Sequence, residues 1–146
     1  ARRGRRIAVL VTGDTGLCSF AQPVLKRFGR EACTLIPGIS SVQVAFARLG
    51  LDWLDARILS THREAPKLGA RTRSRYDKLA ILLGRRDSLV WVATLARNLG
   101  KEYRVFVCEN LTLGNERVRE VPAARLRRLK VSSLAIALLV KKGLLA

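Results

Sequence analysis

Two segments of the 146-residue chain close on glycine-containing turns that suit ligand binding. The first reads VTGDTGLCSF over residues 11–20, and the second reads IPGISSVQVAFARLG over residues 36–50. In each, an apolar run leads into a turn and then into a helical pattern, as in the ligand crevices at the carboxyl ends of strands in open α/β sheets. Gly13 permits a sharp turn with close approach to a ligand, and amides at the helix start near Ser40 can hold polar ligand atoms. The pair favours a ligand crevice at the strand ends, whereas either turn by itself is more often a plain turn or a helix cap.

Side chains for metal or nucleophilic chemistry are scarce. The three cysteines show no CxxC spacing and His62 is the single histidine, so the sequence gives no support to a zinc site. We interpret Cys33 and Cys108, which lie in apolar runs, as buried small hydrophobes, and we favour packing for Cys18 as well. A lone histidine is more often a surface or packing residue than a proton shuttle, so both readings of His62 stay open.

The excess of positive charge indicates either an anionic partner or an arginine-rich surface that only faces solvent. The net charge is +17 with a pI near 11.4, and nucleic acid is the usual partner of such a chain. Aromatic residues make up only 5%, however, which provides no base-stacking platform. Arginine also suits carboxylates, and an arginine-rich solvated face is a further reading. The basic clusters lie at residues 2–6, 71–75 and 125–130.

Alternating apolar runs and helical patterns predict an α/β architecture. One helix is expected between Pro23 and Gly29, and another ends at Gly50. A third is expected to be capped by Asp87, and a short one to open at Pro122. Strands are predicted at residues 7–12, 32–36, 79–83, 103–108, 117–121 and 133–140, and residues 56–61 are expected to begin a second unit. The basic stretch 63–75 is expected to be a loop.

The ends and the hydropathy of the chain indicate a cytoplasmic protein. There is no methionine even at position 1, so we expect the native amino terminus to lie upstream. The longest strongly apolar stretch, residues 134–140, is far short of the ~20 residues that span a bilayer. No signal-peptide pattern is visible.

Four stretches taken together resemble a known family. The two turn segments are followed by LGLDWLDARILSTH (residues 49–62) and FVCENLTLGNERV (residues 106–118). In this order they resemble the tetrapyrrole methylases, and within them the corrin-ring carbon-5 methyltransferases that act on precorrin-6Y or cobalt-precorrin-7. The resemblance begins downstream of the family's GxGPG loop. It implies an α/β, tetrapyrrole-methylase-like two-domain fold without the first part of the amino-terminal domain, with residues 1–55 in that domain and 56–146 in a carboxyl-terminal domain with a mixed sheet.

The resemblance implies S-adenosylmethionine (SAM) as cofactor, bound folded between the domains, and a tetrapyrrole (precorrin) substrate. SAM carries its own leaving group, so the protein chiefly has to align the reactants and exclude water. The implied substrate-binding residues are Ser60, His62 and Arg63, with His62 as the one catalytic candidate. The implied cofactor-binding residues are Gly13, Asp14, Leu17, Ser40, Ser41, Leu83, Gly84, Glu109 and Asn110. The chain departs from the family at Thr15, where the family has proline, and in STHRE (residues 60–64), which lacks a glycine.

Partners follow from the same resemblance. A separate carbon-15 methyltransferase that also decarboxylates is expected on another polypeptide, because the chain ends directly after its last expected strand. Arg63, Arg71 and Arg73 are expected to bind ring carboxylates. No membrane partner is expected, nucleic acid is disfavoured and a homo-oligomer is left open. The competing hypothesis is a basic nucleic-acid- or protein-binding α/β domain that keeps a methylase scaffold without activity.

Overall fold

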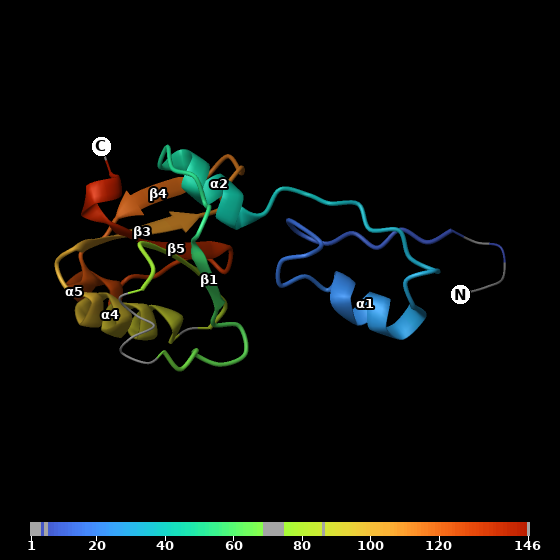
Figure 1. Cartoon of the computed structure of the whole chain (residues 1–146), viewed down its shortest axis with the longest axis horizontal. Helices are drawn as coiled ribbons and strands as arrows, with labels where there is room; N and C mark the ends of the chain where they lie inside the picture. The colour runs from blue at the N-terminus through green and yellow to red at the C-terminus, as the bar shows by residue number, and fades with distance from the viewer. Residues whose placement is uncertain (1–3, 5, 69–74, 86, 146) are drawn as a thin grey trace. The chain divides into compact units, whose positions relative to one another are not determined.

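The computed structural model describes residues 4, 6–68, 75–85 and 87–145. The chain divides into two compact units, Ala1–Ser40 and Ser41–Ala146. Figure 1 shows that the second unit carries the sheet and most of the helices. The domain boundary expected between residues 55 and 56 stays a prediction.

One mixed five-stranded sheet forms the second unit, in the order β1-β2-β5-β3-β4. Strands β1 and β2 are parallel, whereas β5 is antiparallel to both β2 and β3, and β4 is antiparallel to β3. The four strands from β2 to β5 were predicted from the sequence to within two residues at either end, and β1 lies where a second unit was expected to begin. Their bounds are β1 Arg57–Ser60, β2 Lys78–Leu83, β3 Tyr103–Glu109, β4 Arg117–Glu120 and β5 Ala135–Lys141.

Helices cover both faces of this sheet. On one face, helix α4 (Ser88–Leu99) and the short helix α5 (Ala123–Leu126) lie beneath the sheet in Figure 1. The core on this face joins Val92 of α4 to alternate residues of the central strands, such as Ile81 and Ala137. Helix α2 (Ser41–Arg48) packs against β5 with buried Val42, Ala45 and Phe46. Strand β5 is therefore covered on both sides, which explains its continuous apolar run.

The first unit has one helix and no strand among its described residues. Helix α1 spans Ala21–Phe28, with Pro23 in its first turn and Gly29 closing it through an N–H bond to the Leu25 carbonyl, as predicted. The strands predicted at residues 7–12 and 32–36 are wrong for this structure. Strand geometry needs a neighbour to pair with backbone groups, and the apolar side chains here face water, with Leu10 94% and Ile36 79% exposed.

The start of helix α4 also differs from expectation. Asp87 occupies the position before the helix, but its side chain makes no capping hydrogen bond. Both of its carboxylate oxygens instead accept from the Arg85 guanidinium, at 3.0 and 3.2 Å. An arginine two residues away therefore outcompetes the helix amides for this carboxylate.

Within the described part of the chain, every helix is too short or too polar to cross a bilayer.

Candidate functional site

The two glycine turns of the first unit touch through their backbones. Gly13 has φ +71°, a conformation that glycine adopts without strain. A Cβ on Gly38 would lie only 2.5 Å from the Gly13 carbonyl oxygen. The structure thus brings together the two segments singled out in the sequence, and it does so at a separation that only glycine at position 38 allows.

Side chains in the first turn shape the turn itself. The Asp14 carboxylate accepts a hydrogen bond from the Gly16 amide at 2.7 Å, and the Leu17 amide donates to the Asp14 carbonyl at 3.3 Å. Asp14 and Leu17 are half-buried, whereas Ser40 is buried. The first unit contains four of the predicted cofactor residues, Gly13, Asp14, Leu17 and Ser40. Ser41 is exposed at the start of α2 and belongs to the second unit.

The remaining predicted residues of the second unit lie along one edge of the sheet. Ser60 pairs with Leu82 in the β1–β2 ladder. Leu83 and Glu109 both pair with Ala135, from opposite sides of β5. The carboxyl ends of β1, β2 and β3 therefore meet at the same edge, which we call the carboxyl edge. This is the edge where open α/β sheets place ligands.

His62 and Gly84 are in direct contact at this edge. A Cβ on Gly84 would fall 2.5 Å from ring atoms of His62 and 2.7 Å from its Cα. The Ser60 hydroxyl lies 3.0 Å from His62 Nδ1, and the His62 amide donates to the same oxygen at 3.3 Å. The imidazole is exposed, so Ser60 orients a ring whose other nitrogen is open to solvent or ligand.

A buried chain of hydroxyl groups fixes the residue before His62. Thr61, 1% exposed, has its hydroxyl 3.0 Å from the Leu82 carbonyl and 2.7 Å from Ser88 Oγ, and the Arg85 amide donates to Ser88 Oγ at 3.0 Å. One hydroxyl proton cannot serve two acceptors. All groups are satisfied when Thr61 donates to the carbonyl and Ser88 donates to Thr61. The end of β1 is thereby tied to β2 and to α4.

Arg85 extends this connection to the predicted substrate residue Arg63. Its guanidinium donates to the Arg63 carbonyl at 2.8 Å while pairing with Asp87. The Arg63 side chain is exposed beside His62 in the chain. The other two arginines expected to bind ring carboxylates, Arg71 and Arg73, lie outside the described residues.

Glu109 is buried and its carboxylate is fully engaged. One oxygen accepts from the Ser132 amide at 2.9 Å, and the other accepts from the Arg119 guanidinium. The Ser132 hydroxyl in turn donates to the Asn110 side-chain oxygen at 2.7 Å. Asn110 has φ +50°, a conformation that asparagine tolerates better than most residues. Glu109 thus holds the loop before β5 against the end of β3, and its side chain faces protein groups.

Sequence reasoning missed the residues that support the carboxyl edge. Thr61 and Ser88 are separated by 27 positions, and Ser132 is 22 positions from Asn110. No spacing in the sequence indicates such pairs, because they form only when the strands are in register. The nearest signal was the polar character of Thr61 and Ser88 next to apolar strand and helix runs.

Cys108 and the acidic residues add no chemistry to the edge. Burial, with a smaller effect from the Glu116 charge, raises the pKa of the Cys108 thiol to about 12, so it stays protonated and unreactive near neutral pH. Among the described residues, no group of three or more His, Cys, Asp or Glu side chains could hold a metal ion.

Comparison with known sequences gives consistent matches. The model of the family described as tetrapyrrole (corrin/porphyrin) methylases matches residues 1–127. A cobalt-precorrin-7 C(5)-methyltransferase of Salmonella typhimurium is 32% identical over 128 residues, which cover 85% of this chain and 61% of the relative. A decarboxylating precorrin-6Y C(5,15)-methyltransferase of Mycobacterium tuberculosis is 27% identical over 118 residues, covering 80% of this chain and 30% of the relative. The chain thus spans less than two thirds of either relative.

Solved structures share the fold. A precorrin-6Y methylase from Archaeoglobus fulgidus is 30% identical with a TM-score of 0.52, covering 81% of this chain and 56% of that one. A uroporphyrin-III C-methyltransferase from Thermus thermophilus complexed with S-adenosylhomocysteine (SAH) has a TM-score of 0.65 at 18% identity, covering 88% of this chain and 62% of that one.

Proposed function

Because the chain belongs to the tetrapyrrole (corrin/porphyrin) methylase family, we propose that it is a SAM-dependent C-methyltransferase that acts at carbon 5 of a corrin-ring precursor in cobalamin biosynthesis. The substrate is precorrin-6Y or cobalt-precorrin-7. The similarity to a cobalt-precorrin-7 C(5)-methyltransferase over 85% of this chain supports this substrate class.

The observation that carries the proposal is the carboxyl edge. Three strand ends meet there, and most of the second-unit residues that resemble the family's cofactor and substrate positions end these strands or follow directly after them. Glycine at position 84 allows His62 to lie directly against the end of β2. Methyl transfer from SAM needs this kind of shaped surface more than it needs a reactive side chain.

The proposed reaction balances without a further reagent. An electron pair of the ring carbon forms the new carbon–carbon bond to the methyl group while the sulfur–methyl bond of SAM breaks. The sulfur keeps that bond's electrons and leaves as SAH, and the methylated ring releases one proton. The protein's task is to hold the methyl group in line with the ring carbon and to exclude water.

We assign the cofactor to two sets of residues. In the first unit these are Gly13, Asp14, Leu17 and Ser40, supported by the close approach of the two glycine turns. In the second unit the set is Ser41, Leu83, Gly84 and Asn110. Glu109 is a positioning residue in this proposal. Both of its carboxylate oxygens already accept hydrogen bonds from protein groups, and through Ser132 it holds the loop beside Asn110.

The substrate is assigned to Ser60, His62 and Arg63. Ser60 orients the His62 ring, and the exposed Arg63 side chain offers a planar donor for a ring carboxylate. The net charge of +17 favours a substrate that carries several carboxylates.

Methyl transfer to the purified precorrin tests this function. The protein is incubated with SAM labelled in its methyl group, and the corrinoid is analysed by mass spectrometry. We expect SAH release together with one labelled methyl group at carbon 5. A protein that binds random DNA duplex with a steep salt dependence, and neither binds SAH nor methylates, would instead support the basic binding-domain alternative.

We further propose that the carbon-15 step belongs to a separate polypeptide. The Salmonella relative is named for carbon 5, whereas the Mycobacterium relative, of which this chain covers only 30%, is named for both carbons. The purified protein should therefore add one methyl group and leave the carboxyl group in place. Loss of carbon dioxide with a second methylation would contradict this assignment.

A further inference from the structure

A second concave site lies at the sheet edge opposite the carboxyl edge. It is a pocket of about 440 Å³ between the end of α4, the start of β3, the end of β4 and the start of α5. This size lies within the range of small-molecule sites. Tyr103, which begins β3, pairs with Lys141 at the far end of β5, so the strands themselves separate this pocket from the residues assigned to methyl transfer.

Basic side chains dominate the pocket, which we call the basic pocket. Four line it, Arg97, Lys101, Arg104 and Lys142, against the single carboxylate of Glu120. Arg104 lies 3.6 Å from Glu120. Among the described residues, Arg97, Lys101 and Lys142 have no carboxylate within ion-pairing distance, although other cations such as Lys78 and Lys141 are paired. Like charges gathered without partners repel one another, so a bound anion would relieve a local cost.

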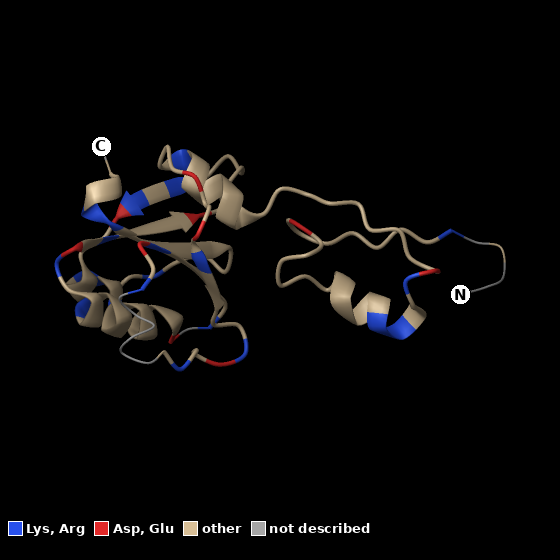
Figure 2. Ribbon diagram, viewed as in Figure 1, with Lys and Arg blue, Asp and Glu red and all other residues tan. Residues whose placement is uncertain are grey.

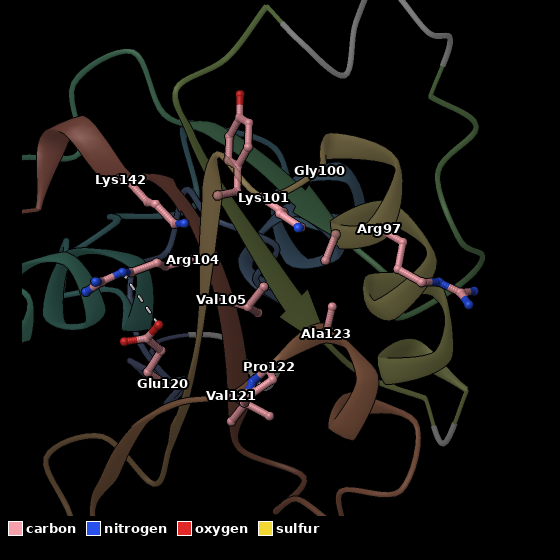
Figure 3. A pocket seen from close by; sticks show the side chains of 12 residues that line it. Arg97, Gly100, Lys101, Arg104, Val105, Glu120, Val121, Pro122, Ala123 and Lys142 are labelled. Atoms are coloured by element: carbon pink, nitrogen blue, oxygen red, sulfur yellow. Dashed lines mark ion pairs between the residues drawn. The ribbon is translucent and has the colours of Figure 1, made fainter.

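The pocket combines this charge with an apolar floor. Figure 3 shows Lys101 and Lys142 reaching toward the pocket, whereas Arg97 extends away from it and Arg104 extends away from Val105 to its ion pair with Glu120. Ala96, Val105 and Val121 at the floor are core residues. The carbonyls of Ala96 and Arg97 at the end of α4, which would repel an anion, both accept from the Gly100 amide. The site therefore suits a ligand with an apolar ring and a compact anionic group.

A phosphate fits these features better than a carboxylate does. A phosphate group concentrates up to about two negative charges and three acceptor oxygens in a small volume, and lysine binds it as a point charge. Figure 2 shows Lys and Arg spread over helices, strands and loops of the chain. The basic pocket differs from those surfaces because its two lysines, which have no ion-pair partner in the described part of the chain, lie beside a concave apolar floor.

We propose that the basic pocket binds a small organic phosphate of the size of a mononucleotide, with its ring against Val105 and Ala123 and its phosphates at Lys101 and Lys142. This proposal does not depend on the methyltransferase assignment, since none of these residues belongs to that site.

Calorimetric titration with uridine diphosphate at physiological salt tests the proposal, because this probe lacks the adenine of SAM. We expect saturable binding at one site. The Lys101→Ala, Lys142→Ala double variant should weaken it at least tenfold. All the substituted side chains are exposed, so circular dichroism should show unchanged folding.

Three controls distinguish specific binding of the probe in the basic pocket from non-specific electrostatic binding to a highly basic protein. Lys26→Ala removes one charge from an exposed position outside the pocket and should leave binding unchanged. Excess SAH should not displace the probe, and inorganic pyrophosphate should bind more weakly than uridine diphosphate. The proposal is overturned by absence of binding, by equal losses in Lys26→Ala, by displacement with SAH, or by equal affinity for pyrophosphate.

Discussion

Gly84 lies against His62 so closely that a Cβ at position 84 would come within 2.7 Å of the His62 Cα. The obstacle is backbone and not the far end of a flexible side chain, so it cannot swing away. The contact joins the end of β2 to the loop after β1. Gly84 is assigned to the cofactor and His62 is the one catalytic candidate, so this contact joins the two parts of the proposed site.

Gly84→Ala should therefore reduce methyl transfer with modest loss of stability. The added methyl group has to move the His62 loop, and displacements near 1 Å at a reacting centre cost up to ~100-fold in rate. We expect a 10- to 100-fold fall in kcat/KM and about 1–3 kcal/mol of destabilisation. Gly143→Ala is the matched control, because its Cβ would meet open space. Unchanged kinetics in Gly84→Ala would contradict the role of this contact.

Gly38→Ala tests the first unit in the same way. Its Cβ would meet the Gly13 carbonyl oxygen at 2.5 Å, so the two glycine turns would have to separate. We expect SAH affinity, measured by calorimetry, to fall at least tenfold, with Gly143→Ala unchanged. Full SAH affinity in Gly38→Ala would show that the approach of the two turns is not needed for cofactor binding.

Thr61→Val removes the central hydroxyl of the buried chain while keeping its shape. The Leu82 carbonyl keeps the Thr61 backbone amide as a donor at 3.0 Å, but the Ser88 hydroxyl loses its acceptor. Leaving such a buried polar group unsatisfied costs about 1–3 kcal/mol. Chemical denaturation should show a loss of this size. Thr94→Val is the control, since the Thr94 hydroxyl bonds only to its own helix, at an exposed position. Equal effects of the two substitutions would argue against the buried chain as a support of the edge.

The Arg48–Glu116 pair should make stability depend on pH in the acid range. Hydrogen bonds from Arg48 and then from the Thr112 amide lower the pKa of Glu116 from its ordinary value of 4.5. A lowered folded-state pKa gives stability that is present above 4.5 and is lost as the pH falls through the folded value. Urea denaturation midpoints should fall less steeply on acidification in Glu116→Gln than in the parent. Parallel profiles would contradict this.

The sequence predicted the sheet of the second unit well because its strands are short apolar runs bounded by glycine, charge or proline. The same reasoning failed at residues 7–12 and 32–36, where the runs are equally apolar but find no pairing strand in the described structure. Asp87 was assigned to a cap on local spacing, yet Arg85 takes its carboxylate. The arrangement of the carboxyl edge could not be predicted, because it depends on strand register. Leu83 and Glu109 lie on either side of Ala135 only once β2 and β3 have paired with β5.

Photolabelling with an azido derivative of SAM, followed by tryptic peptide mapping, tests the central claim most directly. The account predicts that label protected by excess SAH falls in the peptides 7–26, 79–85 or 105–117, which carry Asp14, Gly84 and Asn110. Labelling should be lost in Asp14→Ala and kept in Glu31→Ala, an exposed carboxylate of the same unit. SAH-protected label confined to other peptides, such as 98–101 or 120–125 of the basic pocket, or full labelling of Asp14→Ala would contradict the assignment of the cofactor site.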